Sequence, residues 1–318
     1  MDNYLLDLMI CRIPGLKGDE RIKLVKKFDS LEDFCLLSKS DLENTVERLF
    51  KDSSWSMADI RLMAEKDAVQ AKKAGIRMVS WRDAEYPPLL REIFDPPALL
   101  FYRGALPDPE KATVAIVGTR KPTPRAAERA FSLGQEFGEA GIPVVSGLAL
   151  GIDAMAHRGN IQGRGATVAV LGSGADMVYP SSNRDLARRI LESGGAIISE
   201  YPPGTRPLKG HFPARNRIIS GLSRGTVIVE APEKSGALIT AQFALDEDRD
   251  LWIDTFGVSS PRGAGTARLA GEGAKVISSA RDILVEWNIA VPEKREDAVQ
   301  SNGGGLASSM AEYLNINL

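Results

Sequence analysis

The chain has 318 residues, a formal net charge of −2 at pH 7, 43% hydrophobic residues and 26% charged residues. This length is typical of about two domains, and the composition is that of an ordinary globular protein. No run of about 18 apolar residues occurs, which excludes a predicted membrane-spanning helix. The N-terminus lacks the basic region that begins a signal peptide, so we expect a cytoplasmic protein.

Two cysteines and two histidines leave little material for metal or redox chemistry. Cys11 and Cys35 form no CxxC pair, and we expect both to be small core residues in a reducing compartment. The histidines are His157 and His211, and neither belongs to a set with zinc-ligand spacing. The sequence therefore predicts no metal site.

Residues 1–75 have the apolar spacing of an all-helical domain. Ser30 and Asp33 fit a helix-capping box, and Ser40 is a candidate cap for the next helix. The turn PGLKG at 14–18 resembles the turn of helix-hairpin-helix and sterile-alpha-motif (SAM) modules. In some proteins such a turn offers backbone amides to DNA phosphates. A helical interaction or spacer domain is the alternative, and the sequence does not decide between them.

Residues 76–290 alternate short β-branched runs with helical segments. Residues 76–81 and 98–104 have strand composition, and the prolines between them predict extended connections and edge strands. Six further runs each end in Gly, Ser or Pro: TVAIVGTR, IPVVSGLALG, TVAVLGSG, AIISEYPPG, TVIVEAPEKSG and DLWIDTFG. The alternation predicts an α/β fold with a doubly wound, mostly parallel sheet covered on both faces. Residues 291–318 predict a flexible linker and a short C-terminal helix.

Ligand-binding residues are expected directly after these runs, because doubly wound sheets bind ligands outside the carboxyl ends of their strands. Three donor-rich loops supply the candidates Gly118, Thr119, Arg120, Ser146, Gly147, Ser235 and Gly236. The first loop combines a glycine, a hydroxyl and a guanidinium, which is a phosphate-binding composition; a purely structural glycine is the alternative. The second has two glycines before a helix, which predicts exposed amide donors at the helix N-terminus.

A local basic concentration follows in the run HFPARNRIISGLS, residues 211–223. Between residues 201 and 229 there is no acid, and the cations are Arg206, Lys209, Arg215, Arg217 and Arg224. Such a run usually meets phosphate. The alternative is a solvated loop whose arginines pair with carboxylates elsewhere. We expect this run and the three loops to converge on one crevice that holds phosphate.

No catalytic constellation stands out in the sequence. The dinucleotide fingerprint GxGxxG, the Walker sequence and the GxSxG elbow are absent. Asp153, Glu200 and Glu230 follow strands, but no pair has a spacing that argues for acid–base chemistry. We expect His157 to be a packed residue rather than a general base. The sequence predicts neither an enzyme nor a nucleotide cofactor.

Six motifs in this order resemble the DNA-processing protein A family, also called Smf: GTR, VVSGLALGIDAMAH, VAVLGSGADMVYP, IISEYPPG, FPARNRIISGLS and VEAPEKSGALITAQFAL. The resemblance covers roughly residues 80–290, and the helical N-terminal module fits the family's architecture. It implies an extended Rossmann fold that binds single-stranded DNA without a cofactor. It also implies a homodimer that loads RecA recombinase on incoming DNA during natural transformation, with no catalytic activity.

The resemblance assigns DNA-binding roles to residues that match the family's motifs. Gly118, Thr119 and Arg120 occupy its GSR position, Ser146 and Gly147 begin its SGLA loop, Lys209 stands at a DNA-contacting lysine, Phe212 at an aromatic that meets the strand, and Arg215, Asn216 and Arg217 at its RNR segment. Cations follow the phosphate backbone, and an aromatic face supports a base without selecting it.

The sequence also departs from the family pattern. Leu150 replaces an arginine of SGLARGID, residues 246–274 differ from the usual pattern, and no complete C-terminal winged-helix domain is predicted. Two other functions stay open. One is a nucleotide-processing hydrolase of the phosphoribohydrolase type, although APEKSGALITA lacks that group's PGG and helical Glu. The other is an adaptor that binds only protein.

Overall fold

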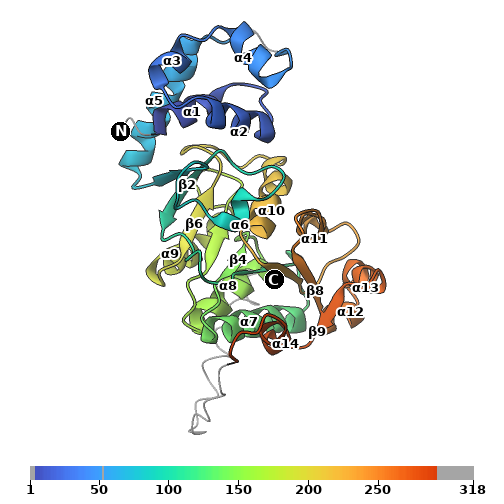
Figure 1. Ribbon diagram of the computed structural model, residues 1–318. Helices are drawn as coiled ribbons and strands as arrows, with labels where there is room; N and C mark the ends of the chain where they lie inside the picture. Colours follow the sequence, from blue (N-terminus) through green and yellow to red (C-terminus); the bar gives the residue numbers. More distant parts are fainter. Residues whose placement is uncertain (1–3, 52–53, 292–318) are drawn as a thin grey trace.

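The computed structural model describes residues 4–51 and 54–291, and a small helical region rests on one end of a larger sheet domain (Figure 1). The helices of this region are α1 (Leu5–Arg12), α2 (Gly18–Lys27), α3 (Leu31–Cys35), α4 (Lys39–Val46) and α5 (Met57–Lys73). The Ser30 hydroxyl accepts from the Asp33 amide at the start of α3, which is one of the two hydrogen bonds of the predicted capping box. The cap expected at Ser40 is wrong, because Ser38 forms the capping box of α4 and Ser40 lies inside that helix.

One nine-stranded sheet contains all the strands predicted from composition, and it adds a ninth that was not predicted. The strands are β1 (Arg77–Ser80), β2 (Leu99–Gly104), β3 (Val114–Val117), β4 (Val144–Ser146), β5 (Val168–Val170), β6 (Ala196–Ser199), β7 (Gly225–Ile228), β8 (Asp250–Asp254) and β9 (Lys275–Ile277). Their spatial order is β1-β2-β6-β5-β4-β3-β7-β8-β9. The pairings of β1 with β2 and of β2 with β6 are antiparallel, and those from β6 to β9 are parallel. The predicted α/β, mostly parallel sheet is confirmed.

Helices cover both faces of the sheet, because its central strands are apolar on both sides. One face carries α6 (Pro88–Arg91), α10 (His211–Gly221), α11 (Gly236–Asp246) and α13 (Ala264–Gly271). The other carries α7 (Pro124–Glu139), α8 (Ile152–Gln162), α9 (Arg184–Glu192) and α14 (Ala280–Glu286). The doubly wound arrangement predicted from the sequence is therefore present.

The chain changes its direction across the sheet at β3. From β3 it proceeds through β4 and β5 to β6, and α10 then returns it to β7 on the other side of β3. Doubly wound sheets bind ligands at such a switch point, outside the carboxyl ends of the strands. Here that place is formed by the loops after β3, β4 and β7 and by the start of α10.

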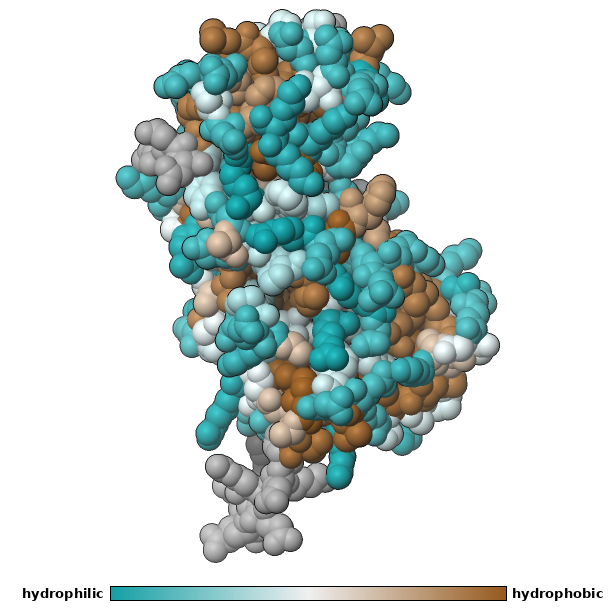
Figure 2. Space-filling model, in the orientation of Figure 1, coloured by the Kyte–Doolittle hydropathy of each residue, from teal (hydrophilic) through white to brown (hydrophobic). Residues whose placement is uncertain are grey.

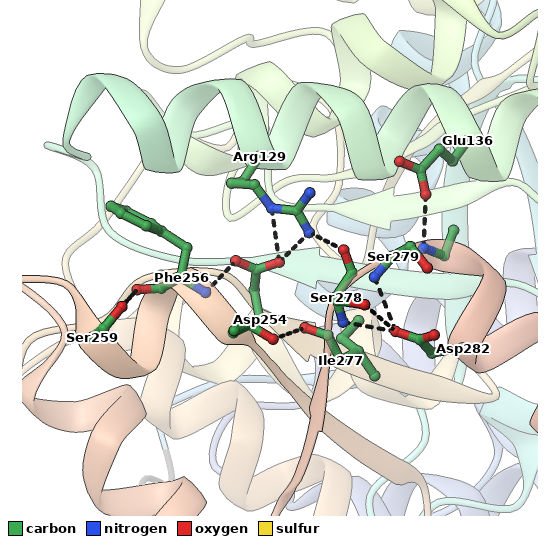
Figure 3. A network of polar contacts seen from close by, with 11 residues as sticks. Arg129, Glu136, Asp254, Phe256, Ser259, Ile277, Ser278, Ser279 and Asp282 are labelled. Atoms are coloured by element: carbon green, nitrogen blue, oxygen red, sulfur yellow. Dashed lines mark hydrogen bonds and ion pairs between the residues drawn. The ribbon is translucent and has the colours of Figure 1, made fainter.

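A polar network joins α7 to the end of β8 and to the segment that follows β9 (Figure 3). The guanidinium of Arg129, on α7, donates to the buried carboxylate of Asp254 at 2.6 Å and to the Ser278 carbonyl at 2.7 Å. Asp254 also caps α12 (Thr255–Ser259) by accepting from the Phe256 amide at 3.0 Å. The end of β8 and the segment after β9 are thereby held to α7.

The helical region shares a core with the sheet domain. One buried apolar cluster contains Leu8 of α1 together with Phe101 of β2. At its margin Arg82, which follows β1, donates to Asp7 and to Asp29 at 2.8 Å each. The helical region is thus packed against the β2 side of the sheet. None of the helices in the described ranges is long and apolar enough to cross a bilayer.

Candidate nucleic-acid interface

The basic run folds as α10, and its first arginine points into the protein. Arg215 is buried, and its guanidinium donates to the Gly147 carbonyl at 2.8 Å and to the Val170 carbonyl. Gly147 leaves room for this guanidinium, because a Cβ at residue 147 would stand 2.4 Å from an Arg215 nitrogen. Burial lowers the pKa of Arg215 to about 10, and the nearby Asp153 carboxylate opposes this shift. Arg215 therefore fastens α10 to the ends of β4 and β5.

The second arginine of the run is also buried and forms ion pairs. Arg217 pairs with Glu200 at 2.7 Å and with Asp95 at 2.9 Å. Burial alone would lower its pKa, but the two carboxylates outweigh burial and raise the pKa. Asn216, between the arginines, donates to the Gly236 carbonyl at 3.2 Å. This corrects the expectation that the arginines of the basic run meet phosphate, because both guanidinium groups lie inside the protein. The alternative, pairing with carboxylates, holds for Arg217, although not in a solvated loop.

The amides of the loop after β4 are also engaged within the protein. Asp153 accepts from the Gly147 and Ala149 amides at 3.1 and 3.3 Å, and the Ile152 amide donates to the Thr119 carbonyl. The buried Ser146 hydroxyl donates to the backbone of β3 at 2.6 Å. The predicted exposed amide donors are therefore wrong for this loop, because a carboxylate on α8 accepts from two of them.

The loop after β3 places one guanidinium in solvent. A Cβ at Gly118 would stand 2.6 Å from Ile152, so this glycine allows close packing of the loop on α8. The Thr119 amide donates to the Glu230 carbonyl at 2.8 Å, and its hydroxyl accepts from the Lys121 amide at 3.2 Å. Of the three motif residues Gly118, Thr119 and Arg120, the exposed one is Arg120.

Aromatic rings gather around this exposed guanidinium. The Arg120 guanidinium lies over the Phe212 ring, 5.5 Å from its centroid. The ring of Tyr179 lies 5.6 Å from Phe212 at a tilt of 43° and is half exposed. Lys209 is exposed three residues before Phe212. We refer to Arg120, Tyr179, Lys209 and Phe212 as the strand-end surface.

The start of α10 is fixed beneath the strand-end surface. The His211 ring stacks on Tyr201 with centroids 3.9 Å apart, and its Nδ1 lies 3.1 Å from the Gly172 carbonyl. Phe212 is held as the next residue of this anchored turn. The sequence reasoning did not single out Tyr179, although this residue lies in the motif VAVLGSGADMVYP that follows β5.

Ser235 and Gly236 lie at the start of α11, next to a separate hollow. The Ser235 hydroxyl accepts from the Ala237 amide and caps the helix. Both residues line a cavity of about 470 Å³ together with Lys234 and Arg268. Hydrophobic side chains gather over α11 and α13 beside it (Figure 2). The Asn216–Gly236 hydrogen bond joins this loop to α10.

The side chains that could serve in acid–base catalysis take part in ion pairs and hydrogen bonds within the protein. Glu200 pairs with Arg217, and Glu230 accepts from the Thr123 amide and hydroxyl at 2.9 Å each. His157 is fully buried, its Nδ1 lies 2.7 Å from the Thr167 hydroxyl, and burial lowers its pKa to about 3. The described residues contain no group of three or more His, Cys, Asp or Glu suited to a metal ion. The expectation that His157 is packed is confirmed.

Known proteins share both the sequence and the fold of this chain. The family described as DNA recombination-mediator protein A matches residues 77–288. The DNA processing protein DprA of Bacillus subtilis is 35% identical over 297 residues, which cover 90% of this chain and 96% of that protein. The Smf protein of Synechocystis is 45% identical over 214 residues, which cover 66% of this chain and 53% of that protein.

Two solved structures extend the similarity to three dimensions. The X-ray structure of DNA processing protein A from Streptococcus pneumoniae has a TM-score of 0.71 at 34% identity, covering 89% of this chain and 96% of that one. DNA processing protein A from Helicobacter pylori, described with a single-stranded DNA binding mode, has a TM-score of 0.58 at 28% identity and covers 67% and 95%. The chain therefore belongs to the DNA recombination-mediator protein A family, known as DprA or Smf.

Proposed function

We propose that this protein binds single-stranded DNA without sequence preference through the strand-end surface. The observation that carries the proposal is the contact of exposed Arg120 with the half-buried ring of Phe212 at the switch point of the sheet, with the guanidinium 5.5 Å from the ring centroid. A guanidinium can pair with phosphate, and an accessible part of a ring can stack with any base. Lys209 and Tyr179 enlarge the same surface. The Helicobacter relative's described binding mode supports the proposal.

The buried motif residues act in this proposal by positioning the strand-end surface. Arg215 ties α10 to the ends of β4 and β5 through carbonyl groups, and Arg217 ties it to Glu200. The Gly147 carbonyl accepts from Arg215, and the Ser146 hydroxyl fixes the same loop to the backbone of β3. Phe212, one turn before Arg215 on the same helix, is thereby held where it faces Arg120.

The biological role we propose is that of a non-enzymatic recombination mediator. As a homodimer, the protein would load RecA recombinase on incoming single strands during natural transformation. Membership of the recombination-mediator family supports this role. The engagement of Glu200, Glu230 and His157 in internal contacts supports the absence of catalysis.

Binding of oligonucleotides to the full chain tests the proposal. We expect fluorescence anisotropy to give similar affinities for single strands of different sequence and weaker binding to a duplex. Arg120→Ala should weaken binding to all single strands and lower the salt slope by about 0.7 for one lost phosphate contact. Arg224→Ala is the matched control, because Arg224 is exposed at the amino end of β7, on the opposite edge of the sheet. Equal binding by Arg120→Ala and the parent would contradict the site.

A further inference from the structure

Phe94 is an exposed aromatic residue that the strand-end surface does not include. Its side chain is 90% exposed, more than that of any other large hydrophobic residue within 4–51 and 54–291. Its neighbours are fixed: Ile93 is buried against Gly221 of α10, and Asp95 pairs with Arg217 of the same helix. The chain thus holds a phenyl ring in solvent between two anchored residues. Exposed apolar surface is unfavourable in water and often marks a binding site.

The position of Phe94 continues the strand-end surface along α10. Arg217, which binds Asp95, stands three and four residues after Ala214 and Pro213, so these residues share one side of the helix. Pro213 and Ala214 are exposed. From Phe212 to Arg217 the helix rises only about 7.5 Å. Two exposed residues of the first turn of α10 therefore lie between Phe212 and Arg217, which holds the segment that carries Phe94.

The residue after Phe94, Asp95, contacts the helical region. A Cβ at Gly18, the first residue of α2, would stand 1.4 Å from the Asp95 carboxylate, so this carboxylate lies directly against the start of α2. The next residue back along the chain, Lys17, lines a cavity of about 440 Å³ with Arg48, Lys51 and the Phe50 ring. The Arg48 guanidinium lies 5.9 Å from the Phe50 centroid.

The charges of this cavity favour a polyanion. Glu20 pairs with Arg48 at 2.7 Å and offsets its charge. Lys17 and Lys51 are exposed, and within the described part of the chain no ion pair engages either of them. Two exposed acids are close in sequence to these residues: Asp19 follows Lys17, and Glu92 precedes Phe94. One pair of a cation and a ring, Arg120 with Phe212, thus lies on one side of Phe94, and two cations, Lys17 and Lys51, line the cavity of the helical region.

We propose that a single strand bound at the strand-end surface continues over Phe94, which stacks with a base, and onto the cavity of the helical region, where Lys17 and Lys51 meet phosphates. This inference rests on the proposed function and adds a second stacking position and a role for the helical region. A strand that uses both parts spans more nucleotides than the strand-end surface alone. Its signature is therefore a dependence of the variant effects on oligonucleotide length.

The test compares variants of the full chain over oligothymidylates from about 4 to about 20 nucleotides. For Phe94→Ala we expect the loss of affinity to rise with length, up to about 5- to 100-fold for the longest strands. Phe94→Trp should retain the parent's affinity. Lys17→Ala combined with Lys51→Ala should lower the salt slope by about 1.4, again only for long strands. Leu62→Ala, an exposed position on α5, is the control for loss of an apolar side chain.

The outcomes separate this inference from the proposed function. If Phe94→Ala and the double lysine variant bind every length like the parent while Arg120→Ala binds weakly, the extension is overturned and the strand-end surface stands. If the parent binds no single strand, both proposals fail. If Phe94→Ala changes the sedimentation of the protein but not its DNA affinity, Phe94 belongs to a protein interface and the extension is overturned. Melting temperatures equal to the parent's verify that the variants are folded.

Discussion

The guanidinium of Arg120 and the ring of Phe212 face each other across 5.5 Å, although the loop after β3 and the start of α10 are distant in sequence. The contact joins the cation and the aromatic face that a sequence-independent DNA site requires. It also means that the two residues stabilise each other's orientation before a strand arrives. Their contributions to binding are therefore expected to be coupled.

A double-mutant cycle measures this coupling. Phe212→Ala should weaken binding of a single strand by about 1–3 kcal/mol through lost stacking. Adding Arg120→Ala should cost less in that background than in the parent, with a coupling of about 0.5–1 kcal/mol for an exposed cation–π contact. Titration of the four proteins with one labelled oligothymidylate gives the value. Strict additivity would show that the contact does not organise the site.

Arg215 and Arg120 should separate stability from binding. Arg215→Met leaves the buried Asp153 without its nearest cation and the Gly147 carbonyl without its donor, so we expect a loss of about 3–5 kcal/mol in the free energy of unfolding. Arg120→Met removes an exposed side chain and should change stability by less than about 0.5 kcal/mol. Urea denaturation of the two variants provides the comparison. Comparable stabilities would mean that Arg215 is not a structural anchor.

The sequence predicted most strands of the sheet because each of them has a local sequence signal. Short β-branched runs ended by Gly, Ser or Pro have few other places in a fold. The strand order, and with it the switch point at β3, was not predicted, because it depends on pairing between strands that are distant in the chain. Local sequence patterns could not predict that the arginines of α10 point into the protein. Asp95, which pairs with Arg217, lies 122 residues away in the chain, and no local pattern marks it as a partner.

The aromatic residues of the surface were only partly predictable. Phe212 was identified through the family motif, whereas Tyr179 and Phe94 belong to loops without periodicity. Whether a loop aromatic is buried or exposed depends on the packing of its neighbours, such as Ile93 against Gly221. The ordered motifs indicated the family, and the structure shows which of their side chains reach the surface.

The Arg129–Asp254 ion pair should stabilise the far edge of the sheet. Asp254 is fully buried, and Arg129 is its only ion-pair partner within the described ranges. Arg129→Ala should lower the free energy of unfolding by about 2–4 kcal/mol, because the remaining carboxylate is left buried and unpaired. Glu128→Ala, exposed on the same helix, is the control. Thermal denaturation measures both, and equal melting temperatures would contradict a stabilising role.

His157 should make the protein less stable in mild acid. Burial lowers its folded-state pKa from the ordinary 6.5 to about 3, so the unfolded chain binds a proton that the folded protein refuses. The contribution of the neutral, buried His157 to the free energy of unfolding is complete above pH 6.5 and is lost progressively as the pH falls toward 3. Glu247 acts in the opposite direction, since burial raises its pKa to about 7 and stability falls as the pH rises from 4.5 to 7.

The variant His157→Gln isolates the histidine from that opposing carboxylate. Glutamine does not titrate, so the difference in unfolding free energy between parent and variant should change by about 1.4 kcal/mol per pH unit between pH 6 and pH 4. The sign is fixed: the parent loses stability relative to the variant as the pH falls. Urea denaturation at pH 4, 5, 6 and 7.5 provides the measurement. A difference that does not vary with pH would mean that His157 accepts a proton in the folded protein.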